Sequence, residues 1–323
     1  MSIELLIRTV TGDISSQELG WCQCHEHLFL SDGKSFQINS ALRMDDEEKS
    51  VEELIAYKRA GGCSYVDAQP FGAGRMAEAM VCASNRSGVK IIASTGFHKT
   101  CFYKEDGFIF RESMQQLHER FVLEIQEGMM ASDQSLERRI DAKAGMMKVA
   151  VDCGGIRANA LYEKLFEAAV SAAAEAGVSI MAHFEKNESA EPLLLLMSQY
   201  GLAPNRLLAC HLDRMRYDIG YHRELAATGV YLEYDTINRL RYHDNEMEIR
   251  LIAALLSDGW KDRLLLSLDT TNQRLRAYGA EMGLDYILTE FSALLQSAGI
   301  TQDELYTMMV HNPSEALAFE ITE

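Results

Sequence analysis

The stretch Trp21-Cys-Gln-Cys-His25-Glu-His27-Leu-Phe-Leu30 is apolar and β-prone, and it carries two histidines two residues apart. Because side chains alternate across a strand, both imidazoles are predicted to lie on one face, where they can share a metal ion. The spacing matches neither the helical His-Glu-x-x-His motif nor a Cys-x-x-Cys zinc knuckle. Taken alone, the pair is equally compatible with two hydrogen-bonded structural histidines. The alternate side chains are predicted to face the helical layer: Cys22, Cys24 and Glu26.

Outward from this stretch, short apolar segments with strand character alternate with longer helix-like segments, most of which end at a glycine. Eight strands are predicted, over residues 21–30, 63–69, 90–97, 145–152, 179–184, 206–212, 230–234 and 263–268. Helices are predicted between them, over residues 47–60, 76–87, 158–176, 188–200, 216–228, 246–257 and 286–298. Eight strand–helix units over about 250 residues predict the α/β class and a (β/α)8 TIM barrel. A doubly wound sheet would show the same local alternation, so the count of eight is what favours the barrel.

The chain shows no sequence repeat, no low-complexity segment and no Pro- or Ser-rich linker, and it contains only four prolines. We therefore predict a single domain over residues 1–323. A short N-terminal β-hairpin is predicted within residues 1–20, and the barrel is predicted to occupy residues 21–323.

The charge balance restricts the kind of partner. Asp and Glu number 48 against 31 Lys and Arg, a formal net charge of −17, which disfavours a nucleic-acid backbone or an anionic membrane as partner. No apolar run approaches the roughly 18 residues of a spanning helix, and the N-terminus lacks the pattern of a secretory signal. Seven cysteines, an odd number, do not indicate a disulfide framework. We expect a cytoplasmic protein that acts on a small molecule, and a homodimer is compatible with the sequence.

Later strands also end in residues that suit a metal. His183, His211 and Asp269 stand at the carboxyl ends of the predicted fifth, sixth and eighth strands. A lone histidine there is more often a satisfied core residue, and a lone aspartate is often a helix N-cap. The carboxyl ends of all barrel strands meet at one mouth, however, so these side chains are predicted to converge with His25 and His27. Imidazole and carboxylate ligands suit zinc, manganese, nickel or cobalt.

Lys148 lies inside the apolar fourth strand, in Gly145-Met-Met-Lys-Val-Ala-Val151. A charged lysine is expensive to bury, so its position needs a chemical reason. One reason is a Schiff base formed by an amine of depressed pKa. The other is a carbamate, formed when the neutral amine adds carbon dioxide, which can bridge two metal ions. Four histidines and an aspartate nearby favour the carbamate.

This pattern resembles the phosphotriesterase family of the amidohydrolase superfamily, and the resemblance runs nearly end to end. It rests on Arg8-Thr-Val-Thr-Gly12, Glu18-Leu-Gly20, His25-Glu-His27, Lys148, His183, His211-Leu-Asp-Arg214 and Asp269. The resemblance implies a binuclear centre of two divalent ions, with zinc expected first and manganese, cobalt or nickel as alternatives. It implies that His25, His27 and Asp269 bind the more buried ion and that His183 and His211 bind the more exposed one. Lys148, carboxylated by carbon dioxide, would bridge the two.

The resemblance also implies hydrolysis by a metal-activated water, with Asp269 and Lys148 as catalytic residues. Asp269 would take the proton as the water attacks and pass it to the leaving group. The family's substrates include phosphotriesters, lactones, carboxylic esters and amides, and the metal site alone does not choose among them. Two other classes stay open, namely a non-catalytic metal-dependent binding protein and a Schiff-base lyase acting through Lys148.

Four arginines stand in the loops after the seventh and eighth predicted strands: Arg239, Arg241, Arg274 and Arg276. In so acidic a chain the cluster predicts a clamp for an anionic substrate, although each arginine alone could be solvated or ion-paired. The region is similar to that of the family's phosphorylated sugar-lactone hydrolases, which implies a sugar phosphate or carboxylate as substrate. Further substrate contacts are predicted at Tyr278 and, after the third strand, at His98, Lys99 and Tyr103.

The segment Gly72-Ala-Gly74-Arg-Met-Ala77 matches the glycine spacing of a dinucleotide-binding turn. Such a turn needs an acidic residue about 20 positions further on to bind the ribose, and residues 91–95 are Ile-Ile-Ala-Ser-Thr. We therefore predict a tight glycine turn at the barrel rim and no nucleotide site.

Overall fold

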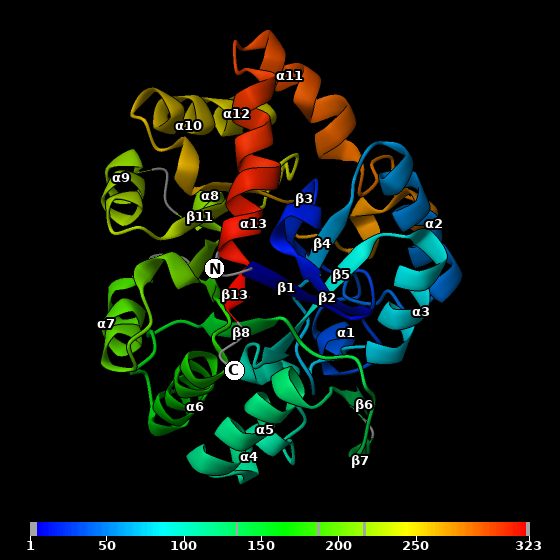
Figure 1. Ribbon diagram of the computed structural model, residues 1–323, viewed down its shortest axis with the longest axis vertical. Coiled ribbons are helices and arrows are strands. Elements are labelled where there is room, and N and C mark those ends of the chain that lie inside the picture. The colour runs from blue at the N-terminus through cyan, green and yellow to red at the C-terminus, as the bar shows by residue number, and fades with distance from the viewer. Residues whose placement is uncertain (1–4, 134, 186–187, 216–217, 321–323) are drawn as a thin grey trace.

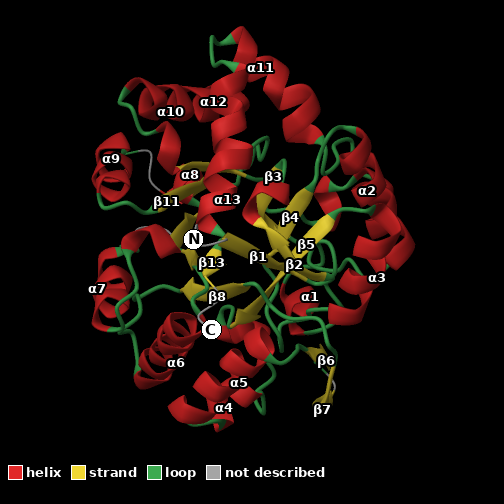
Figure 2. Ribbon diagram, viewed as in Figure 1, coloured by secondary structure: helices red, strands yellow, loops and turns green. Residues whose placement is uncertain are grey.

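A computed structural model describes residues 5–133, 135–185, 188–215 and 218–320 (Figure 1). Eight parallel strands form one sheet in the order β12-β11-β10-β9-β8-β5-β4-β3, and helices surround it (Figure 2). The strands are β3 (Cys22–Glu26), β4 (Ser64–Asp67), β5 (Lys90–Gly96), β8 (Met146–Val151), β9 (Ile180–Phe184), β10 (Leu207–Cys210), β11 (Tyr231–Tyr234) and β12 (Leu264–Leu266). The eight predicted strands and the TIM-barrel class are confirmed.

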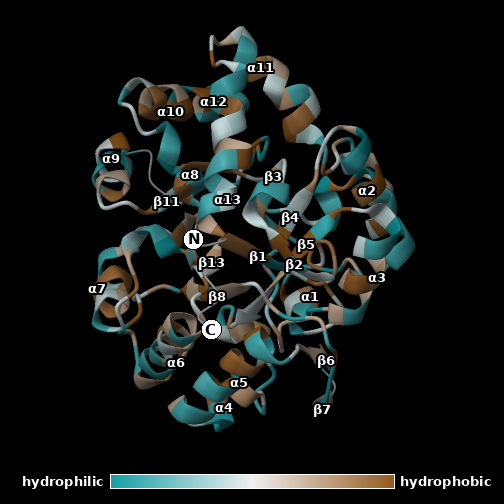
Figure 3. Ribbon diagram, in the orientation of Figure 1, coloured by the Kyte–Doolittle hydropathy of each residue, from teal (hydrophilic) through white to brown (hydrophobic). Residues whose placement is uncertain are grey.

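The predicted helices are also confirmed, except that residues 216–217, at the start of the predicted helix 216–228, lie outside the described residues. They are α2 (Glu47–Arg59), α3 (Ala77–Ser87), α6 (Ala160–Ala176), α7 (Glu191–Gln199), α9 (Ile219–Ala227), α10 (Asn245–Ser257) and the segment Ile287–Phe291 that continues as α11 (Ser292–Ser297). The α6 helix begins where the Asn159 side chain accepts a hydrogen bond from the Tyr162 amide, and it ends at Gly177 with a φ of 72°. Figure 3 shows hydrophobic and hydrophilic colours along these helices, as expected when one face packs on the strands.

Several elements were not predicted. The crossover from β5 to β8 contains α4 (Phe108–Arg111), α5 (Met114–Gln126) and the hairpin of β6 (Met130–Ser132) and β7 (Ser135–Arg139). The sequence does carry a signal for α5, because Ser113 and Gln116 form a capping box at its start. The remaining unpredicted elements are α1 (Lys34–Ile38), α8 (Leu212–Met215), α12 (Gln302–Tyr306), α13 (Asn312–Ala316) and β13 (Phe319–Glu320). No helix of the described residues is long and apolar enough to cross a membrane.

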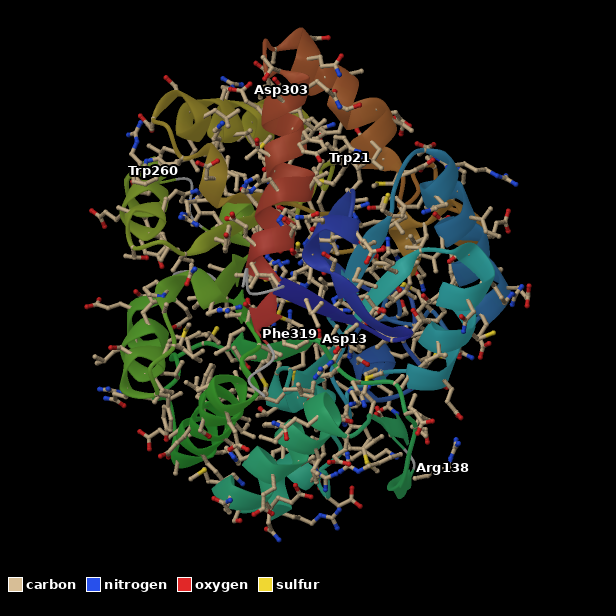
Figure 4. All side chains as sticks on the ribbon, viewed as in Figure 1. Asp13, Trp21, Arg138, Trp260, Asp303 and Phe319 are labelled. Carbon is tan, nitrogen blue, oxygen red and sulfur yellow. The ribbon has the colours of Figure 1, made fainter. Side chains whose placement is uncertain are left out.

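The N-terminal hairpin of β1 (Leu5–Thr9) and β2 (Gly12–Ser15) is confirmed, and it also pairs with β13 near the other end of the chain. Arg8 forms an ion pair of 2.9 Å with Asp13 across the hairpin. Its guanidinium also lies 4.6 Å from the ring centroid of Phe319 (Figure 4 labels Asp13 and Phe319). Ile7 of β1 belongs to the core cluster of the barrel interior, so the hairpin covers one end of the barrel.

One prediction about the side chains of β3 was wrong. Cys22 and Cys24 were expected to face the helical layer, but they pack in the interior cluster with Val66 and Met181. The reason is a shift in the β3–β4 register between Gln23 and Glu26, which no alternation rule anticipates. Cys24 and the following residue therefore both face inward.

Side chains join the first and last strands of the barrel. The Leu268 amide donates to Glu26 Oε1 at 2.7 Å, and the Thr270 amide donates to Glu26 Oε2 at 3.1 Å. The Asp269 amide donates to the His25 carbonyl at 3.1 Å. We call this junction of β3 with β12 the seam. Glu26, expected to face the helical layer, closes the barrel there through both of its carboxylate oxygens.

The glycine turn is confirmed. Gly72 and Gly74 have φ values of 82° and 107°, which favour glycine. Their amides donate to the two carboxylate oxygens of Asp133, at 2.7 and 2.5 Å. The anion held by this turn is therefore a side chain of the protein.

Candidate active site

A cavity of about 650 Å³ opens at the carboxyl ends of the strands. His25, His27, His183, His211 and Asp269 all line it. The barrel thus brings together side chains from β3, β9, β10 and the end of β12, as the strand order predicts.

The first group in the cavity consists of His25, His27 and Asp269. Asp269 Oδ1 lies 3.5 Å from His27 Nε2 and 3.8 Å from His25 Nε2. The three ligand atoms lie within 4.8 Å of one another, close enough to bind one metal ion. Burial lowers the pKa of His25 well below its usual value, so the ring is neutral and can act as a ligand.

The second group is the pair His183 and His211. His211 Nε2 lies 2.7 Å from His183 Nδ1, so these two ring nitrogens face each other. Burial lowers the pKa of both imidazoles well below the usual value. Neutral rings that face each other in this way present lone pairs to a cation. The His25 and His211 ring centroids are 4.8 Å apart, so the two groups are contiguous.

Lys148 lies beside both groups and is fully buried. Its Nζ lies 3.3 Å from His25 Nε2 and 3.5 Å from Met181 Sδ. Among the described residues, no carboxylate forms an ion pair with this amine. Burial lowers the pKa of Lys148, which favours the neutral amine that carbamate formation requires.

Two carboxylates behind the histidines were missed by sequence reasoning. Asp235 is fully buried, and its Oδ1 lies 2.7 Å from His211 Nδ1 while its Oδ2 lies 3.0 Å from His25 Nδ1. One aspartate therefore faces a histidine of each group, and it is hydrogen-bonded to His211. Glu185 Oε1 lies 3.1 Å from His183 Nε2. The available signal was their position, since both directly follow buried strands.

The backbone at the site is strained. His211 has a φ of 65° and Asp269 a φ of 47°, and both are outside the range that residues with a Cβ usually adopt. Such conformations persist where the surrounding structure holds them, and they concentrate at functional sites. Here the turn after each strand directs an imidazole or a carboxylate into the cavity.

Three arginines line the cavity near Asp269. Arg239 Nη1 lies 2.9 Å from Asp269 Oδ2, and Arg214 Nη1 lies 3.7 Å from the same oxygen. The guanidinium carbons of Arg214 and Arg241 lie 5.2 and 5.6 Å from the ring centroid of Tyr242. Arg241 is exposed, and within the described ranges no carboxylate pairs with it. Arg214 and Tyr242 were not predicted as site residues, although Arg214 stands in the quoted His-Leu-Asp-Arg motif.

Other predicted substrate contacts lie elsewhere. Arg274 is buried and donates to the Asn238 and Ile237 carbonyls, at 3.1 and 2.6 Å. Arg276 forms an ion pair of 3.3 Å with Asp285. These two arginines do not line the cavity, because short helical turns after β12 direct them to backbone and surface partners.

The two predicted tyrosines also lie outside the cavity lining. The Tyr278 hydroxyl bonds to Ser50 and to the Asp46 carbonyl, each at 2.9 Å. The Tyr103 hydroxyl accepts a hydrogen bond of 3.0 Å from the His98 amide. His98 and Lys99 do line the cavity, so Tyr103 supports that wall from behind.

Comparison with known proteins supports the resemblance drawn from the motifs. The phospho-furanose lactonase of Mycoplasmopsis synoviae is 27% identical over 325 residues, which cover 97% of this chain and 92% of that protein. The N-acetyltaurine hydrolase of Tetraodon nigroviridis is 26% identical over 355 residues, covering 97% and 98%. The crystal structure of a lactonase from Listeria monocytogenes aligns with a TM-score of 0.88 at 26% identity, covering 98% of this chain and 100% of that one. A profile of the Phosphotriesterase family matches residues 5–317, so the protein belongs to the phosphotriesterase family and is a hydrolase.

Proposed function

We propose that this hydrolase uses two divalent metal ions to open a sugar lactone that carries an anionic group, with a phosphorylated furanolactone as the first candidate. The observation that carries the proposal is the convergence of four imidazoles and Asp269 on one cavity, with the Lys148 amine 3.3 Å from His25 behind it. The same cavity is lined by Arg241, which has no carboxylate partner among the described residues. The phospho-furanose lactonase relative supports the substrate class.

The residues present fit two metal ions. His25, His27 and Asp269 would hold the inner ion, His183 and His211 the outer ion, and carboxylated Lys148 would contact both. The fit is supported by the facing ring nitrogens of His183 and His211 and by the buried amine with no anionic partner among the described residues. Ions bound there would supply an activated water at neutral pH and polarise the substrate oxygen. Zinc suits this nitrogen and oxygen ligand set best, with manganese, cobalt and nickel as alternatives.

Asp269 is suited to carry the proton. One of its oxygens faces the histidines, and the other is held by Arg239, so its orientation is fixed before substrate arrives. It would accept the proton released when water attacks the lactone carbonyl and deliver it to the departing ring oxygen. Arg241 and Arg214, whose guanidinium groups both lie near the Tyr242 ring, would bind the anionic group and position the carbonyl.

A second candidate is hydrolysis of an anionic amide, which the similarity to the N-acetyltaurine hydrolase favours. The same carboxylate and guanidinium groups would serve, because amide hydrolysis also needs an activated water and a proton for the leaving group. Lactone and amide substrates bearing the same anionic group therefore distinguish the two functions.

The test combines metal analysis with a substrate screen. Protein prepared without chelator should hold close to two divalent ions per chain, and phosphorylated aldonolactones should be opened faster than N-acylated amino sulfonates. Full activity without metal would overturn the proposal, as would borohydride labelling of Lys148, which would indicate a Schiff-base lyase. Metal binding without turnover of any lactone, ester or amide would instead indicate a binding protein.

A further inference from the structure

The carboxylate of Glu185 stands directly behind one of the outer histidines. Glu185 follows His183 by two residues, so both side chains leave the same face of the strand end. His183 Nε2 lies 3.1 Å from Glu185 Oε1, while His183 Nδ1 faces His211 Nε2. When Nε2 donates its hydrogen to Glu185, Nδ1 keeps its lone pair. The carboxylate thereby fixes the tautomer in which the ring can bind a cation at Nδ1.

Lys99 binds the same carboxylate oxygen. Its Nζ forms an ion pair with Glu185 Oε1, the atom that also faces His183. Lys99 comes from the loop after β5 and Glu185 from the end of β9, so the pair joins two loops across the cavity wall. The ammonium can hold the carboxylate in the orientation that His183 needs.

The carboxylate that faces His183 is more exposed than the carboxylate that faces His25 and His211. Asp235, which serves those two, is fully buried. The Glu185 and Lys99 side chains keep 24% and 22% of their surface exposed. An exposed ion pair is weaker than a buried and fully bonded one, so the two kinds of support need not be equally firm.

We propose that Glu185 is the positioning residue for His183 and hence for the outer metal ion, and that Lys99 anchors Glu185 in that role. The inference rests on the proposed function, because it assigns a role toward the outer of the two ions. According to this proposal, the affinity for the outer ion depends on the partly exposed ion pair of Glu185 and Lys99 at the cavity rim. The inner ion does not depend on that pair.

Glu185→Ala and Glu185→Gln test the positioning role. Apoprotein is titrated with Zn²⁺ against a competing chelator, and bound metal is counted at each step. Removing the acceptor should weaken the outer ion about 10- to 100-fold and leave the inner ion unchanged. Glutamine keeps an acceptor oxygen, so Glu185→Gln should recover most of the affinity. If glutamine loses the ion as fully as alanine, Glu185 is a direct ligand and the positioning role is wrong.

Lys99→Met tests the anchor. The outer ion should bind several-fold more weakly in Lys99→Met, and the double variant with Glu185→Ala should bind it no more weakly than Glu185→Ala alone. Tighter binding in Lys99→Met would show that the ammonium acts only by charge repulsion and would overturn the anchoring role. Glu191→Ala, at an exposed carboxylate of the adjacent α7, is the matched control and should change nothing.

A spectroscopic measurement separates the two ions. Protein loaded with Mn²⁺ should give an exchange-coupled signal only when both positions are filled, and Glu185→Ala should lose it at metal levels that saturate the wild type. Wild-type protein that binds no ions would overturn the proposed function itself. Wild type and Glu185→Ala that bind two ions with equal affinity would overturn only the role of Glu185.

Discussion

Arg239 Nη1 lies 2.9 Å from Asp269 Oδ2, on the side of the carboxylate that faces away from the histidines. Burial alone would raise the pKa of Asp269, but the Arg239 guanidinium, with His27, holds that pKa well below its usual range. Arg239 is therefore engaged by a carboxylate of the protein itself. Arg241 has no such partner among the described residues and is the better placed of the two to receive an anion.

Arg239→Met should impair every substrate to a similar extent, because it removes the group that orients Asp269. A lost charge-assisted hydrogen bond costs about 1.5–3 kcal/mol, roughly 10- to 150-fold in kcat/KM. The measurement is kcat/KM on a phosphorylated lactone and on its unphosphorylated analogue. A loss confined to the phosphorylated substrate would mean that Arg239 binds the phosphate instead.

Arg241→Met should show the opposite pattern. The phosphorylated lactone should lose about 1.5–3 kcal/mol of transition-state stabilisation, while the neutral analogue should be nearly unaffected. Arg276→Met is the matched control, because its guanidinium pairs with Asp285 outside the cavity lining. Equal losses on both substrates, or a wild type that prefers the neutral lactone, would contradict a phosphorylated substrate. Metal-dependent hydrolysis would not be affected by either result.

Lys148→Ala should lose metal and most of the activity, because the proposed bridging carbamate could not form. Small carboxylic acids should partly restore both, since a carboxylate can occupy the same space. Metal content and lactonase activity are measured with and without added acetate or propionate. Retention of both ions in Lys148→Ala would contradict the bridging role.

Asp235→Ala should weaken both ions together, because one carboxylate faces both His211 Nδ1 and His25 Nδ1. Leaving buried ring nitrogens without a partner should also cost about 1–3 kcal/mol of folding stability. Metal counts and urea unfolding of the metal-free protein measure the two effects separately. A variant that loses only one ion would show that Asp235 supports a single histidine.

The stability of the protein should fall as Asp67 ionises. This carboxyl is fully buried, and burial raises its pKa to about 6. Because the folded state then holds the proton more tightly than the unfolded chain, the stabilisation present at low pH is lost as the pH rises through about 6. Between about pH 5.5 and about pH 7.5 the loss should be about 1 kcal/mol, measured by urea unfolding. Asp67→Asn has no proton to lose there, so an identical pH profile in that variant would contradict the assignment.

The candidate ligands could be predicted because β9, β10 and β12 are almost entirely apolar, and each carries a polar residue near or shortly after its end. His183, His211 and Asp269 stand out for that reason, and burial of Lys148 in such a run is itself a signal. The inward turn of Cys24 could not be predicted, since it depends on a register shift between two particular strands.

The residues that surround the candidate ligands could not be predicted, because they become neighbours only in the folded chain. Asp235 is one of many acidic residues in the chain, and its contact with His25 joins two residues that lie far apart in the sequence. Arg241 and Arg274 look alike in sequence, yet a helical turn directs Arg274 into backbone carbonyls and leaves Arg241 at the cavity. Residue type therefore indicates the chemistry of the site, while the path of the loops decides which residues take part.

The seam between β3 and β12 has a consequence for the order in which the molecule folds. Lys148, His183 and His211 stand on or directly after three consecutive neighbouring strands, so that half of the site can form while the sheet is still growing. His25 and Asp269 belong to the first and last strands, and they meet only when the ends of the sheet join. Closing so long a loop is the slow, entropically costly step of such a topology. His25 and Asp269 should therefore come together last, and the ion proposed to bind there would link the two ends of the sheet across the closure.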